Sequence, residues 1–136
     1  MGNDLSRVEN GIRLDISHWP IVIISPTFDV TDQSIQEFMD SYFELIERKQ
    51  ERYAAVMDLT KRTNMTKNQR KILIDGMNKR REFTGKYSAG TAVVFKSAIV
   101  RGVMMSIFWL FDPKYPTEVC TTVDEAIDWC SKQLDT

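Results

Sequence analysis

The chain has 136 residues and a formal net charge of −1, and its 43% hydrophobic and 27% charged residues exclude an intrinsically disordered protein. This length suffices for one hydrophobic core but not for two, so we expect a single domain over residues 1–136. The polar N-terminus lacks a signal-peptide pattern, and the longest apolar stretch, residues 103–111, is too short to span a membrane. We therefore predict a cytoplasmic protein without a transmembrane segment.

The first half of the chain begins with strand patterns and then changes to a helix pattern. Apolar residues at every second position of 12–16 predict a strand with one buried face. The β-branched run at 21–24 predicts a central strand that is covered on both faces. Apolar residues within 35–46 recur at helical spacing, so we expect a long amphipathic helix whose N-terminus Thr31 or Asp32 caps.

The second half continues the alternation of strands and helices. In chain order we expect a buried strand at 53–57, a helix at 66–81, a central strand at 91–95, a helix at 97–111, a short strand at 118–121 and a last helix from residue 122. Gly76 lies inside the second of these helices and allows a close packing contact there. Thr122-Val123-Asp124-Glu125 has the pattern of a capping box, which begins the last helix.

The order ββαβαβαβα predicts an α/β fold. We expect a mixed, mostly parallel sheet of about five strands with four helices, in which the first two strands pair antiparallel through a short connection.

Few residues are suited to catalysis or metal binding. The six glycines are scattered and form no phosphate-binding loop, and no nucleophile elbow occurs. His18, the single histidine, precedes Trp19-Pro20 and is interpreted as a turn residue. Cys120 and Cys130 are predicted to be two buried thiols rather than a disulfide. We expect no metal, no cofactor and no enzymatic activity, and a sequence pI of about 5.8 predicts no nucleic-acid binding.

The loop that follows the strand at 53–57 is the first candidate site. In parallel sheets, ligand and partner sites gather at the carboxyl ends of the strands, where helix N-termini also lie. Residues 61–86 contain nine basic and two acidic residues, so positive charge concentrates here. Two interpretations stay open, namely a surface that binds a charged partner and a capped helix with a solvated basic face. The candidate binding residues are Thr60, Thr63, Thr66, Lys67 and Arg70.

The apolar segment at 103–111 is the second candidate site. Met104, Met105, Phe108 and Trp109 cannot all face the same side of one helix. Surplus methionine and aromatic surface is typical of interfaces and adaptable grooves. The open alternatives are a dimer contact, a partner surface, the wall of an apolar-ligand pocket, or a helix that the C-terminal helix buries.

Several short stretches carry a family resemblance. They are Asp58-Leu59-Thr60, Gly90-Thr91-Ala92-Val93-Val94, Val100-Arg101-Gly102-Val103, Phe108-Trp109, Pro113-Lys114-Tyr115-Pro116 and Asp124-Glu125-Ala126-Ile127-Asp128-Trp129. With the strand and helix order, they resemble the SpoIIAA-like branch of STAS/SEC14-type domains, over almost the whole chain and most specifically from Gly90 to Trp129. The resemblance implies a non-catalytic regulatory or binding module, and its SEC14-like side implies a lipid or another apolar ligand.

The resemblance also bears on phosphorylation. Antagonists of anti-sigma factors in the wider STAS group carry a phosphorylatable serine in an Asp-Ser-Ser-Gly motif after the equivalent strand. Aligned without gaps on Asp58-Leu59-Thr60 and Met65, this chain has Thr66-Lys67-Asn68-Gln69 there, so Lys67 replaces the phosphoacceptor. The resemblance therefore does not imply the usual kinase-driven switch, and Thr66 is the nearest candidate for phosphorylation.

Together these observations predict a non-catalytic bacterial regulatory module. It would bind a protein partner through the loop and helix start after the strand at 53–57, and residues 104–109 would mediate a homodimer. The alternative prediction is a small apolar-ligand or lipid-binding protein whose pocket is lined by the helix at 97–111.

Overall fold

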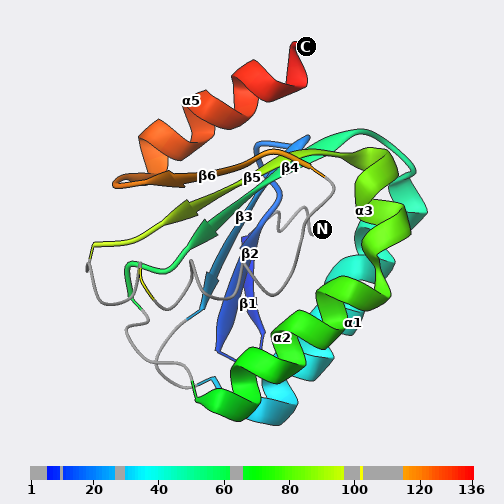
Figure 1. The fold of residues 1–136 in the computed structure, drawn as a ribbon, viewed down its shortest axis with the longest axis vertical. Helices are drawn as coiled ribbons and strands as arrows, with labels where there is room; N and C mark the ends of the chain where they lie inside the picture. Colours follow the sequence, from blue (N-terminus) through cyan, green and yellow to red (C-terminus); the bar gives the residue numbers. More distant parts are fainter. Residues whose placement is uncertain (1–5, 10, 27–29, 62–65, 97–101, 103–114) are drawn as a thin grey trace.

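The computed structural model describes residues 6–9, 11–26, 30–61, 66–96, 102 and 115–136. Within them the chain forms a sheet and helices, shown in Figure 1. The strands are β1 (Ser6–Glu9), β2 (Ile12–Asp15), β3 (Ile21–Pro26), β4 (Tyr53–Asp58), β5 (Ser88–Val94) and β6 (Thr117–Cys120). The helices are α1 (Asp32–Lys49), α2 (Lys67–Lys79), α3 (Arg81–Tyr87) and α5 (Val123–Leu134).

The six strands pair in the same order as they occur in the chain. The pairs β1–β2 and β2–β3 are antiparallel, whereas β3–β4, β4–β5 and β5–β6 are parallel. The connection between β1 and β2 is two residues long, because Glu9 pairs with Ile12, and Gly11 adopts a φ of 80° there. A positive φ of this kind is open to glycine at no steric cost, which explains the tight hairpin.

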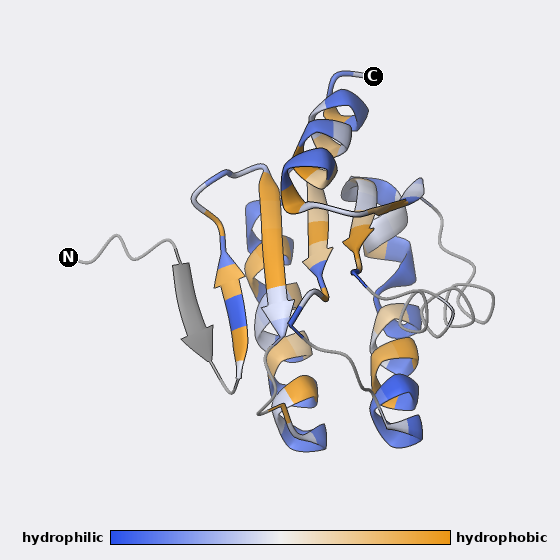
Figure 2. Cartoon of the chain, turned by 90° about the vertical axis from the view of Figure 1, so that its left-hand side faces the viewer, coloured by the Kyte–Doolittle hydropathy of each residue, from blue (hydrophilic) through white to orange (hydrophobic). Residues whose placement is uncertain are grey.

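Helices cover both faces of the sheet and bury hydrophobic cores, the two largest of which lie on opposite faces. The first core lies between the sheet and α1, with α2 beside α1, and the second lies between the sheet and α5 (Figure 1). Alternate side chains of β4 serve the two cores, since Tyr53 belongs to the first whereas Ala54 and Val56 belong to the second. In Figure 2 the strands at the centre of the sheet are accordingly coloured hydrophobic along most of their length.

The α/β class and the mixed, mostly parallel sheet are as predicted. The structure adds strand β1, whose sequence Ser-Arg-Val-Glu has a single apolar residue and hence no readable alternation. The helix expected at 66–81 is two helices, because Arg80 has non-helical φ and ψ angles of −104° and 13° and separates α2 from α3. The helix expected at 97–111 lies outside the described residues except for Gly102, which is helical. None of the described helices is long and apolar enough to cross a membrane.

Threonine side chains cap the three longer described helices. Thr31 and Ser34 form a complete capping box at α1, so of the two predicted alternatives, Thr31 and Asp32, Thr31 is the cap. Thr122 caps α5 as predicted, but the predicted capping box is wrong in one half. The Glu125 carboxylate accepts hydrogen bonds from the backbone and hydroxyl of Thr121 instead of the Thr122 backbone.

Two glycines allow close approaches between elements. A Cβ atom at Gly76 would lie 2.3 Å from Met39 Cε, which confirms the packing contact expected at this position in α2. A Cβ atom at Gly90 of β5 would lie 2.8 Å from Trp129 Cη2 and 3.1 Å from the carbonyl oxygen of Pro116. Glycine at these two positions therefore sets how closely α2 packs on α1 and α5 packs on the sheet.

Candidate functional site

The segment after β4 is tied down at the carboxyl edge of the sheet. The Asp58 carboxylate accepts hydrogen bonds from the Thr60 backbone at 3.0 Å and from the Thr60 hydroxyl at 2.7 Å. Its other oxygen accepts from the Ser25 hydroxyl of β3 at 3.5 Å. The Leu59 N–H donates to the Val94 carbonyl at 3.0 Å and extends the β4–β5 pairing by one residue. Asp58 thus fixes the exit of the strand, as an Asx turn does.

Thr66 and Gln69 fix the start of α2. The Gln69 N–H donates to the Thr66 hydroxyl at 3.0 Å, and the Thr66 N–H donates to the Gln69 side-chain oxygen at 3.2 Å. Gln69 is 5% exposed, and its amide nitrogen donates to the Val30 carbonyl at 3.4 Å. The first turn of α2 is therefore anchored to the chain just before α1, while Thr66 itself stays exposed.

The first turn of α2 is basic rather than acidic. Helix N-termini carry a partial positive charge that favours acidic side chains. The first turn of α1 holds Asp32 and that of α5 holds Asp124 and Glu125, whereas α2 has no acidic residue there and begins with the exposed Lys67. Arg70 follows three residues later and is half-buried. We define Thr60, Thr66, Lys67 and Arg70 as the α2-start surface.

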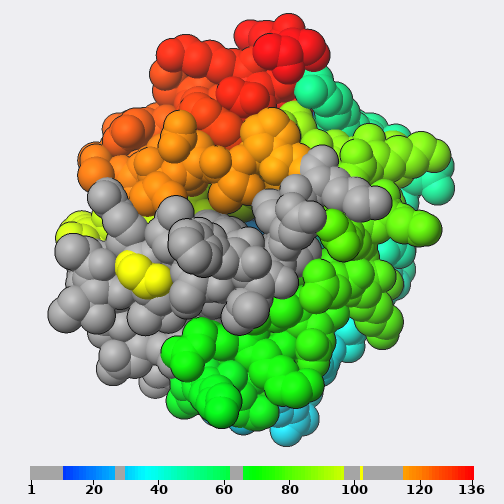
Figure 3. Space-filling model, viewed as in Figure 1, coloured from blue at the N-terminus to red at the C-terminus, as the bar shows by residue number. Residues whose placement is uncertain are grey.

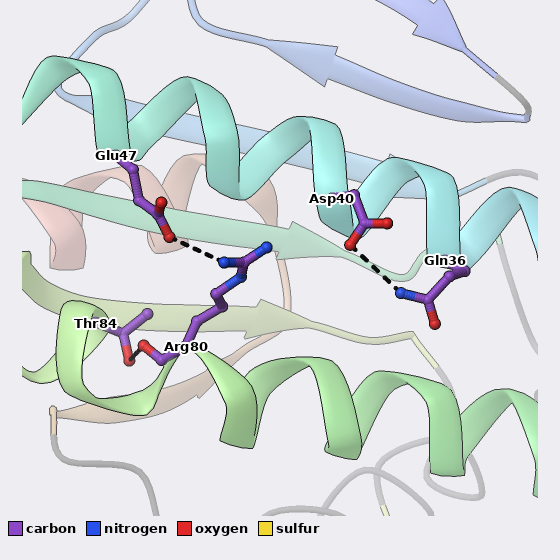
Figure 4. Close-up of polar contacts among 5 residues, drawn as sticks. All are labelled: Gln36, Asp40, Glu47, Arg80 and Thr84. Atoms are coloured by element: carbon purple, nitrogen blue, oxygen red, sulfur yellow. Dashed lines mark hydrogen bonds and ion pairs between the residues drawn. The ribbon is translucent and has the colours of Figure 1, made fainter.

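Further along α2 and α3 the positive charge is partly paired. Lys71 forms an ion pair with Asp75 at 2.8 Å, and Arg80 reaches across to Glu47 of α1 at 3.3 Å (Figure 4). In the space-filling view, α2 and α3 form one continuous surface, and the start of α2 is part of it (Figure 3, green). A solvated, internally paired face therefore accounts for these cations, but not for Lys67.

The structure describes only part of the predicted site. Thr60, Thr66, Lys67 and Arg70 flank the connection from β4 to α2, whereas Thr63 lies outside the described residues. Met104, Met105, Phe108 and Trp109 also lie outside them, so their role in a dimer or a ligand pocket stays a prediction.

The histidine and the two cysteines, which were considered for catalysis, lie in a turn and in the protein interior, respectively. His18 is exposed in the turn between β2 and β3, as predicted. Cys120 and Cys130 are both buried, as predicted, and burial raises the pKa of the Cys130 thiol to about 12. The Cys130 thiol donates to the Ala55 carbonyl at 3.6 Å. Thiols in such surroundings stay protonated at neutral pH and are poor nucleophiles. Among the described residues, no three His, Cys, Asp or Glu side chains gather as metal ligands would.

Sequence reasoning missed two cavities between the sheet and the α1–α2 layer. They measure about 60 and 70 Å³, and five side chains line both of them, from β3, α1, β4 and α2. Each of these elements shows its apolar stripe in the sequence, but a stripe does not reveal where packing leaves space.

Comparisons with known proteins bear on the fold. No family model and no curated protein matches the chain. A solved structure does match, that of an uncharacterized DUF3478-family protein from Shewanella loihica PV-4 that is described as having a SpoIIAA-like fold. The TM-score is 0.61, with 14% sequence identity over 96% of this chain and 98% of that one. The chain has a SpoIIAA-like fold.

The SpoIIAA-like fold confirms the resemblance read from the sequence at the level of architecture. The stretch that carried most of that resemblance, Gly90 to Trp129, begins and ends at two residues that are in direct contact in the structure. At 14% sequence identity, the fold is what the two proteins share.

Proposed function

We propose that this chain is a non-catalytic regulatory module that binds an acidic surface of a protein partner through the α2-start surface. The observation that carries the proposal is the cation at the start of α2. Lys67 occupies a position where the helix dipole disfavours positive charge, by about 0.3–1 kcal/mol. A residue that lowers the stability of the helix in which it lies is typical of a functional position.

The surroundings of this surface support recognition without rearrangement. Gln69 ties the helix start to Val30, and Asn68 donates to Asp32 of α1. Asp58 holds Thr60 on the opposite side of the connection. A surface whose backbone is fixed before binding loses little conformational entropy when a partner docks, which favours affinity.

Two matched double variants test the proposal. The test variant is Lys67→Glu with Arg70→Gln, in the α2-start surface. The control variant is Lys79→Glu with Lys132→Gln, outside that surface, and it changes the net charge of the protein by the same amount. Quantitative mass spectrometry after a pull-down from the source cells should show a partner that the wild type and the second variant retain. We expect the first variant to lose it by about tenfold or more, which corresponds to about 1.4 kcal/mol. Equal recovery by the two variants would remove the α2-start surface from the proposal.

A stability measurement separates lost binding from lost folding. Lys67→Glu alone places an acidic residue in the first turn of α2, so the free energy of unfolding should rise by about 0.3–1 kcal/mol. Weaker partner binding in a more stable protein is the expected combination. A variant that is both less stable and unable to bind would point instead to a structural role of Lys67.

A further inference from the structure

The two cavities beneath α1 and α2 adjoin each other and differ in polarity. The cavity of about 60 Å³ lies toward Pro26 and Leu59 and has an apolar lining. The cavity of about 70 Å³ lies toward Tyr53 and Tyr115. The side chains that line both cavities are Ile24, Phe38, Met39, Met57 and Leu73. A flexible methionine at such a boundary can change rotamer and let two small spaces join.

Hydroxyl groups gather at the second cavity. The phenols of Tyr42 and Tyr53 lie within hydrogen-bonding reach of each other, and so do the Tyr115 phenol and the Thr91 hydroxyl. Burial raises the pKa of all three phenols above the ordinary value of 10.0, so they stay protonated at neutral pH. Tyr53 is 2% exposed, and it is one of the residues that line this cavity. The second cavity is thus lined by neutral hydrogen-bonding groups at one end.

The lining sets the charge and size of a ligand. None of the described residues that line the cavities is charged, so a carboxylate or ammonium group would lose its hydration without gaining an ion partner. A water molecule needs roughly 10–15 Å³ of such space, and a cavity of roughly 150 Å³ binds benzene. The adjoining cavities therefore suit a short aliphatic chain better than a long acyl chain or a large ring system.

We propose that the space between the sheet and α1–α2 binds a neutral, short-chain aliphatic molecule with one hydrogen-bonding oxygen, such as an alkanol. Its alkyl chain lies in the apolar cavity, and its oxygen lies at Tyr53 in the phenol-lined cavity. This site is distinct from the α2-start surface, none of whose residues lines either cavity.

The first experiment uses the wild-type protein with hexanol and hexanoate as probes. Titration at neutral pH is followed by the methyl signals of Met39, Met57 and Leu73 in heteronuclear magnetic resonance spectra. We expect saturable shifts of these methyl groups with hexanol and none with the hexanoate anion, which has the same chain length. Absence of saturable shifts with hexanol, or equal binding of both probes, would overturn the proposal.

Two variants then locate the bound molecule. Tyr53→Phe removes one hydroxyl and should weaken hexanol binding about two- to tenfold, the effect of one neutral hydrogen bond. Gly76→Ala displaces the methyl group of Met39, a residue that lines both cavities, so it should also weaken binding. Gly102→Ala is the matched control, because a Cβ atom there meets nothing within 4 Å. Unchanged hexanol affinity in both folded test variants would contradict the assigned site.

If either variant fails to fold, the comparison of hexanol with hexanoate on the wild type still decides the question. Lys67→Glu should bind hexanol as the wild type does. Failure of this proposal and failure of the proposed partner surface are therefore distinguishable.

Discussion

Thr66 is exposed, and its side chain nevertheless holds the first turn of α2 in place. The same oxygen that caps the helix is the one that a kinase would modify, and it lies beside Lys67. A phosphate group at this position would add two negative charges at the positive end of a helix, where such charge is stabilised. The contribution of the Thr66 side chain to stability can be measured directly.

Replacing Thr66 tests its capping role. We expect Thr66→Ala to lower the free energy of unfolding by about 1 kcal/mol, because the Gln69 N–H loses its acceptor. Thr66→Ser keeps the hydroxyl and should change stability by less than about half of that. Urea denaturation followed by circular dichroism measures both values. If serine costs as much as alanine, packing of the threonine methyl group rather than capping explains the effect.

The packing of α5 on the sheet depends on one position in β5. At Gly90 the indole of Trp129 and the backbone of Pro116 both lie within about 3 Å of the place where a Cβ atom would be. The obstacle at Gly76 is instead the terminal methyl group of Met39, which can rotate away. The two glycines therefore tolerate a methyl group to very different extents, although both lie in close contacts.

The comparison of Gly90→Ala with Gly76→Ala tests this difference. We expect Gly90→Ala to destabilise the protein by about 1–3 kcal/mol, the usual cost of overpacking a contact that cannot relax. Gly76→Ala should cost less, because alanine is also favoured over glycine inside a helix by about 1 kcal/mol. Thermal unfolding of both variants provides the measurement. A larger loss for Gly76→Ala would show that Met39 has no alternative rotamer.

Local sequence patterns were sufficient for most elements but not for their ends. β3 and β4 were predictable because burial on both faces requires continuous apolar runs. β1 was not, because an edge strand needs few apolar side chains. The break at Arg80 also left no signal, since neither glycine nor proline occurs there. The location of the α2-start surface was predictable, because it follows a buried strand. The lack of an acidic residue in the first turn of α2 became informative only when this turn was compared with the first turns of α1 and α5, which do contain acidic residues.

Features that depend on several distant segments could not be predicted. The phenol-lined cavity combines α1, β4 and the segment before β6, which lie far apart in the chain. The pKa values of its tyrosines and of Cys130 follow from the same burial, and they affect the stability of the protein as a unit. When the pKa of an acidic group is higher in the folded state than in the unfolded chain, the unfolded chain loses the proton first as the pH rises. Stability then decreases with rising pH above the pKa of the unfolded chain.

The free energy of unfolding should therefore fall in alkaline solution. Below pH 9.0, the ordinary pKa of a thiol, Cys130 is protonated in both states and contributes no pH dependence. Between pH 9.0 and about 12 the unfolded chain loses this proton more readily, so stability decreases as the pH rises. The buried phenols add to the decrease above pH 10.0. Denaturant titrations at a series of pH values measure it, and Cys130→Ala should reduce the slope between pH 9.0 and 10.0.

A wild-type stability that stays constant or rises above pH 9.0 would contradict this assignment. An unchanged slope in Cys130→Ala would assign the decrease to other groups.

The strand order of the sheet has a consequence for how the chain assembles. Among the residues that the structure describes, each strand after β1 pairs with the strand that precedes it in the sequence. During synthesis from the N-terminus, each newly completed strand thus meets a template that has already left the ribosome, and none has to wait for a later segment to be inserted between two existing neighbours. The parallel half still requires a crossover for each addition, whereas the hairpin of β1 and β2 closes locally.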